Sequence, residues 1–154
     1  MTGVQTCALP IYQPEQLDRL LDRLAQGADM VKGSRWVKGG SVINWPKQRE
    51  FLSRGGSLYA RTILGVPVRD LTGGFKCFRR GVLQTIDLGA IRSKGYGFQI
   101  ETTYRVIRAG FRVVEIPIVF VDRRVGESKM DGSIVVEAML QVPSLRWRAL
   151  RGAL

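Results

Sequence analysis

The stretch from Val31 to Gly56, VKGSRWVKGGSVINWPKQREFLSRGG, constrains the fold of this chain more than any other. Its start, together with Met30, predicts a short apolar strand that breaks at Gly33 and leaves Arg35 at the strand's end. A glycine-rich loop follows, and a helix is expected from Pro46 onwards. The stretch therefore predicts a strand and a helix joined by a loop, with a basic side chain where the loop begins.

Three polar side chains of this stretch are candidates for binding a phosphate monoester. Arg49 and Ser53 lie four residues apart on the expected helix and so share one face. Arg35 would face them from the strand end, and its forked N–H groups match phosphate oxygens. We predict that Arg35, Arg49 and Ser53 together bind this phosphate. The alternative is that both arginines are solvated surface charges.

The flanking segments predict the rest of an α/β domain. An amphipathic helix begins near Pro14 and ends at Gly27, and a strand follows it, which indicates one unit of an α/β sheet. Pro117 predicts an edge position or the end of strand pairing for the segment that contains it. The further expected elements are a helix over Lys47–Leu64, a strand over 75–79, helices over 81–87 and 98–109, a strand over 112–121 and a helix over 133–150.

The composition bounds the possible partners. The chain has 154 residues, enough for one domain with a real core, and its net charge of +11 predicts an anionic partner. Histidine is absent, which removes the commonest general base near neutral pH and the commonest metal ligand. The two cysteines match no metal or redox spacing, and no run of eighteen apolar residues predicts a membrane span.

Three further sites carry polar residues with more than one interpretation. Asp70 precedes a Thr-Gly-Gly turn, and the residues alone favour a role as the cap of that turn. Gln99 and Glu101 fall in the first turn of the helix expected over 98–109, where a carboxylate is favourable. The loop 122–132, DRRVGESKMDG, could bind a diphosphate through its cations and the backbone amides near its glycines. The residues alone favour the interpretation as an ordinary charged loop.

Residues 2–11, TGVQTCALPI, resemble one reading frame of a translated sequencing adapter. We interpret residues 1–11 as a foreign segment and exclude them from the expected fold. A genuine strand or a signal peptide is the alternative, although the segment lacks the basic start and long apolar core of a signal peptide. On this interpretation the natural protein has lost its N-terminal part.

Six motifs follow one another along the chain: GSRWVKGGSVINWP, RxxxS at 49–53, VRDLTGGFKCFRR, GYGFQIE, AGFRVVEIPIVFVDR and GESKM. Their order is the one found in polyprenyl-phosphate mannose synthases, which the chain resembles. These enzymes resemble dolichyl-phosphate mannosyltransferases, which are inverting family 2 glycosyltransferases. The resemblance covers the chain from Tyr12 to about Ser133. It implies a partial Rossmann-like, GT-A type nucleotide-sugar domain over residues 12–132 that lacks its N-terminal βα units. The residues after it predict a basic amphipathic helix over 133–154.

The resemblance implies that mannose passes from GDP-mannose to a polyprenyl monophosphate with inversion, the acceptor phosphate attacking directly. Such a phosphate is largely a dianion at pH 7, so it needs no general base. Carried over position by position, the acceptor-phosphate role falls on Arg35, Arg49 and Ser53. The donor-diphosphate role falls on Arg124, in the loop that also holds Ser128 and Lys129. Asp70, Gln99 and Glu101 match positions near the sugar and are the catalytic candidates.

The metal site of the family is where this sequence departs from the resemblance. The Asp-x-Asp motif would align at Cys7 and Leu9, neither of which suits a cation that prefers oxygen ligands. We therefore expect Mg²⁺ or Mn²⁺ in the full-length parent and none on this fragment. We also expect the fragment to be inactive by itself.

The expected partners are GDP-mannose in the parent, polyprenyl phosphate and an anionic membrane surface, with no nucleic acid. The expected location is peripheral, on the cytoplasmic face of the membrane. A close alternative is transfer of glucose or amino-arabinose to the same carrier. Alternatives of another class are a basic nucleic-acid-binding module and a non-catalytic peripheral membrane protein that uses the two basic helices.

Overall fold

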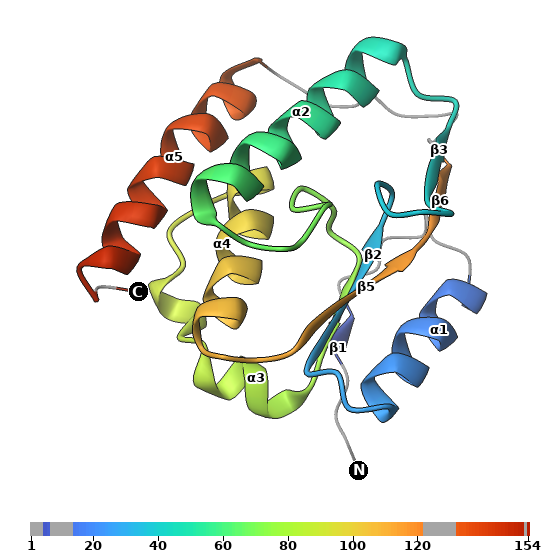
Figure 1. Cartoon of the computed structure of the whole chain (residues 1–154), viewed down its shortest axis with the longest axis horizontal. Helices are drawn as coiled ribbons and strands as arrows, with labels where there is room; N and C mark the ends of the chain where they lie inside the picture. Colours follow the sequence, from blue (N-terminus) through green and yellow to red (C-terminus); the bar gives the residue numbers. More distant parts are fainter. Residues whose placement is uncertain (1–4, 7–13, 122–131, 153) are drawn as a thin grey trace.

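A computed structural model describes residues 5–6, 14–121, 132–152 and 154 of the chain. It has mixed α/β structure, which confirms the predicted α/β class, while the GT-A type of fold stays a prediction (Figure 1). The elements in chain order are β1 (Gln5–Thr6), α1 (Pro14–Ala25), β2 (Met30–Ser34), β3 (Ser41–Ile43), α2 (Lys47–Leu64), β4 (Lys76–Phe78), α3 (Arg80–Thr85), the 3₁₀ helix η1 (Leu88–Ala90), α4 (Gly95–Arg108), β5 (Val113–Pro117), β6 (Val119–Val121) and α5 (Gly132–Leu150).

The strands form a four-stranded sheet in the order β1-β4-β2-β5 and a separate parallel pair of β3 and β6. In the sheet, β2 is parallel to β5 and antiparallel to β4. Pro117 is the last residue of β5, which lies at an edge of the described sheet, and this confirms the position predicted for it. At the other edge β1 pairs antiparallel with β4, so a segment that the sequence interpretation left out of the fold contributes two residues to the sheet.

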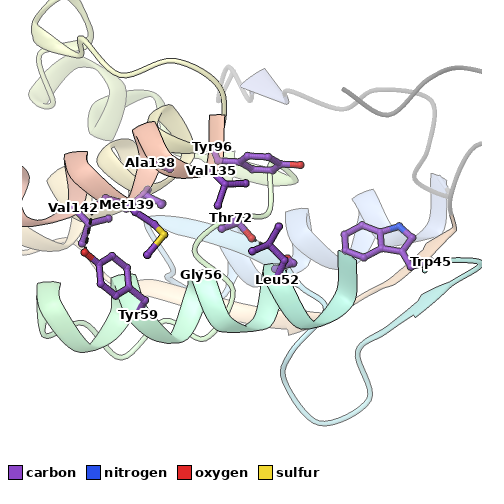
Figure 2. Close-up of a pocket in the computed structure, with 12 residues that line it drawn as sticks. Trp45, Leu52, Gly56, Tyr59, Thr72, Tyr96, Val135, Ala138, Met139 and Val142 are labelled. Carbon is purple, nitrogen blue, oxygen red and sulfur yellow. Dashed lines mark hydrogen bonds between the residues drawn. The ribbon is translucent and has the colours of Figure 1, made fainter. Parts of the chain in front are cut away.

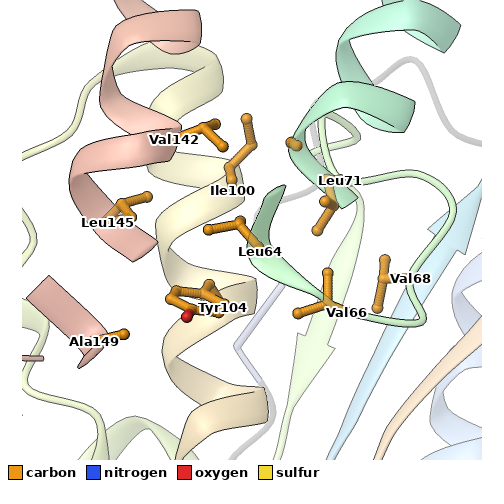
Figure 3. Packing of buried hydrophobic residues seen from close by; sticks show 10 residues of the cluster. Leu64, Val66, Val68, Leu71, Ile100, Tyr104, Val142, Leu145 and Ala149 are labelled. Carbon is orange, nitrogen blue, oxygen red and sulfur yellow. The ribbon is translucent and has the colours of Figure 1, made fainter. Parts of the chain in front are cut away.

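Helices cover both faces of the sheet (Figure 1). Because successive residues of β2 point to opposite faces, Val31 packs with Leu20 and Leu24 of α1, whereas Met30 packs with Val106 of α4. The largest apolar cluster lies where α2, α4 and α5 meet beside the segment 66–71 (Figure 3). Its central members include Leu64, Leu71, Ile100, Tyr104, Val142 and Leu145. The α2 helix thus packs against α5 and contacts α4 through this cluster.

Two of the boundaries that differ from the sequence predictions bear on the site. The strand β2 does not break at Gly33 but runs through it to Ser34, because Gly33 pairs with Ile116 of β5. The α4 helix begins at Gly95, three residues earlier than expected, so Gln99 and Glu101 lie beyond its first turn. The helix-dipole interpretation of Glu101 is therefore wrong.

Gly33 is expected to be the costlier of two matched glycine substitutions. A Cβ at Gly33 would lie 2.7 Å from Cδ1 of Phe75 and 2.9 Å from Cγ2 of Ile118, so Gly33→Ala is expected to overpack the core and cost about 1–3 kcal/mol. At Gly55, inside α2, a Cβ would meet nothing within 4 Å, and Gly55→Ala is expected to stabilise the helix by up to about 1 kcal/mol. Urea unfolding followed by circular dichroism measures both. Equal effects of the two substitutions would contradict the close packing at β2.

Candidate functional site

The three predicted phosphate-binding residues lie close together at the N-terminal end of α2. Arg35 follows β2, and its Cζ is 5.1 Å from the ring centroid of Trp45. Arg49 reaches the same ring from α2, with its Cζ 4.1 Å from the centroid. Ser53, one helical turn further, has its Oγ 3.2 Å from Oγ1 of Thr72, which also accepts a hydrogen bond of 3.0 Å from Nη2 of Arg35. The structure therefore brings Arg35, Arg49 and Ser53 together.

Arg35 is held by Asp70 in a buried bidentate ion pair. Its Nε donates to Oδ2 and its Nη2 to Oδ1, both at 2.7 Å, and its backbone N–H donates to Oδ2 at 3.0 Å. The side chains are 6% and 0% exposed. Burial by itself opposes ionisation of Asp70, but the hydrogen bonds and charge of Arg35, with the charge of Lys32, hold the pKa of that carboxylate below its usual value.

Asp70 also caps its own turn, as the sequence predicts, by accepting a hydrogen bond of 3.0 Å from the backbone N–H of Gly73. The ion pair with Arg35, 35 residues away, is the part that no local pattern indicates. One carboxylate thus fixes both the turn and the guanidinium. This geometry makes Asp70 a group that orients Arg35.

A layer of buried charges supports this turn from the sheet. Lys32 of β2 lies between Lys76 of β4 and Glu115 of β5 in the strand register. Its Nζ donates to the backbone carbonyl of Gly73. Burial lowers the pKa of Lys32 to about 8, against the partly opposing charge of Asp70. The hydrogen bond from Lys32 and the one that Asp70 accepts hold Gly73, and with it the turn, in one position over the sheet.

Thr72 is a site residue that the sequence pattern does not single out. Besides Arg35 and Ser53, its hydroxyl contacts Oγ of Ser57 at 3.3 Å. Ser57 follows Ser53 by four residues on the same face of α2, and this spacing could have indicated Ser57, although not Thr72, from the sequence. The result is a cluster of three hydroxyl groups beside one buried guanidinium.

A groove with mainly apolar walls adjoins these hydroxyls between α2 and α5 (Figure 2). Its cavity volume is about 50 Å³, so it is a shallow groove and not a deep pocket. Ser53 and Thr72 line it, and Oη of Tyr59 donates a 3.0 Å hydrogen bond to the carbonyl of Met139, which links the two helices. The other lining residues are Trp45, Leu52, Gly56, Tyr96, Ile100, Val135, Ala138 and Val142. Such a groove suits an amphiphile whose polar head lies at the hydroxyl cluster.

Gln99 and Glu101 occupy different environments on α4. Gln99 lies beside Gly74, since its Nε2 is 3.5 Å from the position that a Cβ of Gly74 would take. Glu101 is fully buried and accepts hydrogen bonds of 3.0 and 2.8 Å from Nε and Nη2 of Arg105. Nη1 of Arg148 lies 3.8 Å from the same carboxylate, so Glu101 joins α4 to α5. Its predicted place near the sugar stays a prediction.

The predicted donor-diphosphate residues, Arg124, Ser128 and Lys129, lie outside the described residues, and so do Cys7 and Leu9. Within the described ranges, no group of three or more His, Cys, Asp or Glu side chains could hold a metal ion. The oxygens of Asp70 are already engaged by Arg35 and by the turn. The expected Mg²⁺ or Mn²⁺ of the full-length parent stays a prediction.

Large apolar side chains are exposed on α2 and α5, which lie side by side (Figure 1). Phe51 is 80% exposed on α2 and Leu140 is 72% exposed on α5. Arginines accompany them, and the guanidinium of Arg151 stacks 4.2 Å from the ring centroid of the exposed Trp147. None of the helices in the described parts of the chain is long and apolar enough to cross a membrane.

Two curated proteins resemble this chain over most of its length. It is 50% identical over 147 residues to a Micrococcus luteus protein named undecaprenyl-phosphate mannosyltransferase, in an alignment that covers 93% of this chain and 60% of that protein. It is 52% identical over 131 residues to polyprenol monophosphomannose synthase of Mycolicibacterium smegmatis, with 85% and 49% covered. No protein-family model matches. The resemblance indicated by the six motifs is confirmed, and the chain spans about half to three fifths of the length of these relatives.

Proposed function

We propose that this chain is the acceptor-binding part of a polyprenyl-phosphate mannosyltransferase that uses GDP-mannose as donor. The observation that carries this proposal is the convergence of Arg35, Arg49 and Ser53 around Trp45 and Thr72. Trp45, Thr72 and Ser53 also line the apolar groove, so the two arginines lie next to it. Guanidinium and hydroxyl groups suit a phosphate, and the apolar walls of the groove suit the hydrocarbon next to that phosphate. The names of the two relatives support both the lipid phosphate and the mannose.

In this mechanism the lipid phosphate is the nucleophile. Its second pKa is near 6, so it is mostly a dianion at neutral pH and needs no histidine to remove a proton. One phosphate oxygen forms a bond to the anomeric carbon while the bond from that carbon to the diphosphate of GDP breaks, and GDP leaves with the electron pair. Attack opposite the leaving group inverts the anomeric configuration.

The residues of this chain contribute orientation. Arg35 and Arg49 hold the phosphate, and Asp70 fixes the guanidinium of Arg35 so that the nucleophilic oxygen has one direction of approach. Asp70 is not the base, because its oxygens are engaged by Arg35 and by the turn. We assign the donor diphosphate to Arg124, Ser128 and Lys129, and a position near the sugar to Gln99.

The exposed apolar side chains of α2 and α5 support peripheral binding to an anionic membrane on its cytoplasmic face. An amphipathic helix lies in the interface with apolar side chains among the acyl chains and cations near the headgroups. Phe51 and Leu140 would supply the apolar contact, and Arg151 the charge. A groove between the same two helices would then receive its lipid from the bilayer side.

The direct test of the phosphate site compares farnesyl phosphate with farnesol as ligands of this chain in calorimetry. The wild type is expected to bind the phosphate more tightly than the alcohol. Arg49→Gln is expected to lower the affinity for farnesyl phosphate by about tenfold to a hundredfold and to leave the affinity for farnesol unchanged. The reason is that a hydrogen bond to a charged group contributes about 1.5–3 kcal/mol.

The matched control is Arg61→Gln, since Arg61 is an exposed arginine on the same helix, and it is expected to leave both affinities unchanged. Two results would contradict the proposed function. One is equal affinity of the wild type for the alcohol and the phosphate. The other is equal loss of phosphate binding in the Arg49 and Arg61 variants.

A further inference from the structure

The turn that carries Thr72 is fixed from two sides. On one side Asp70 accepts the backbone N–H of Gly73, and on the other Lys32 donates to the carbonyl of the same residue. Glu115 accepts the backbone N–H of Asp70 at 2.9 Å, which ties the start of the turn to β5. Thr72 lies between these contacts, so its hydroxyl has a defined position before any ligand arrives.

The hydroxyl of Thr72 has more polar neighbours than it can bond at once. Nη2 of Arg35 lies at 3.0 Å, the hydroxyls of Ser53 and Ser57 at 3.2 and 3.3 Å, and Oδ1 of Asp70 at 3.5 Å. A hydroxyl offers one proton and two lone pairs. Because Arg35 and Ser57 can supply the two accepted bonds, the single proton of Thr72 can be directed to another oxygen.

Only part of this cluster is accessible to a ligand. Thr72 and Ser53 line the groove, whereas Ser57 is 1% exposed and is not among the lining residues. A ligand oxygen in the groove can therefore contact Thr72 directly. Ser57 can influence that ligand only through Thr72.

We infer that Thr72 is a fourth phosphate-binding residue, which donates its hydroxyl proton to an oxygen of the lipid phosphate. Ser57 is a positioning residue that donates to Thr72 and leaves its proton for the ligand. In the absence of ligand that proton can go to Oγ of Ser53 or to Oδ1 of Asp70, so binding exchanges one hydrogen bond for another and leaves no buried donor unpaired. This inference rests on the proposed function, because it deepens the description of the same phosphate site.

The test uses Thr72→Val, which keeps the shape and removes the proton, with farnesyl phosphate and farnesol as probes. We expect affinity for the phosphate to fall about tenfold or more and affinity for the alcohol to change less than about twofold. Thr72→Ser is expected to restore phosphate binding. The matched control is Thr62→Val at an exposed threonine of α2, whose hydroxyl bonds only within its helix, and it is expected to change neither affinity.

A second measurement separates a binding role from a packing role. The second pKa of bound farnesyl phosphate, followed by ³¹P NMR, is expected to rise in Thr72→Val relative to wild type, because a donor to the dianion has been lost. If that variant does not fold, Ser57→Ala is expected to give a smaller loss, of about threefold, in phosphate affinity alone. A wild type without preference for the phosphate would overturn the proposed function. A wild type with that preference, together with unchanged phosphate binding in the Thr72→Val or Ser57→Ala variant, would overturn only the role of Thr72.

Discussion

Asp70→Asn is expected to lower the free energy of unfolding by about 3–5 kcal/mol, the largest stability effect of any single substitution considered for this chain. The substitution removes the charge that faces the buried guanidinium of Arg35 and leaves Lys32 with one fewer opposite charge. Removing one partner of a buried ion pair is costly because the other charge remains away from water. Urea unfolding at pH 7 measures the loss.

The matched control for this charge removal is Glu50→Gln on α2. Glu50 pairs with Arg54 at 2.9 Å, but both side chains are exposed to solvent, at 35% and 58%. Exposed pairs of this kind contribute about 0–1 kcal/mol, so the control is expected to change stability by less than that amount. Similar losses in the two variants would mean that the buried Arg35–Asp70 pair contributes no more to the free energy of unfolding than the exposed Glu50–Arg54 pair.

The stability difference between wild type and Lys32→Met is expected to depend on pH above 8. The pKa of Lys32 is about 8 in the folded protein and 10.5 in its ordinary state. Between these values the unfolded chain holds a proton that the folded chain has lost, so the stability of the wild type rises with pH. The rise relative to Lys32→Met is expected to reach about 3 kcal/mol by pH 10.5.

Unfolding measured at pH 7, 8, 9 and 10.5 gives this difference directly, because other titrating groups are shared by the two proteins and cancel. The groups that face Lys32 are Asp70 and Glu115, which favour its charged form, and Arg35, which opposes it. Lys38→Met is the control, since Lys38 is exposed, and its difference from wild type is expected to be flat. A flat difference for Lys32→Met would show that the lysine reaches water in the folded state.

The parts of the fold that the sequence predicts are those set by neighbours in the chain. The bounds of α2 are correct, because Pro46 precedes it and Gly65 ends it with a φ of 67° that glycine adopts readily. Gly27, with a φ of 97°, likewise follows the end of α1. Pro117 at the end of an edge strand follows from its missing N–H.

The parts that the sequence does not predict depend on contacts between distant residues. The continuation of β2 through Gly33 is decided by its pairing with β5, more than 80 residues later, and not by the glycine itself. Glu101 looks like a helix-terminus carboxylate by position, but it is buried with Arg105 and lies near Arg148 of another helix. Thr72 gains its importance only when its turn is placed over α2.

The bidentate contact between Asp70 and Arg35 has a consequence for how a lipid would be recognised. A long flexible side chain loses much rotational freedom when it binds a ligand, and this loss weakens binding. At Arg35 that freedom disappears when the polypeptide folds, so a headgroup meets a receptor that is already rigid. The conformational freedom that is still lost on binding is then that of the isoprenoid tail. The length and unsaturation of the tail, and not rearrangement of the protein, would therefore be the main variables in the entropy of association.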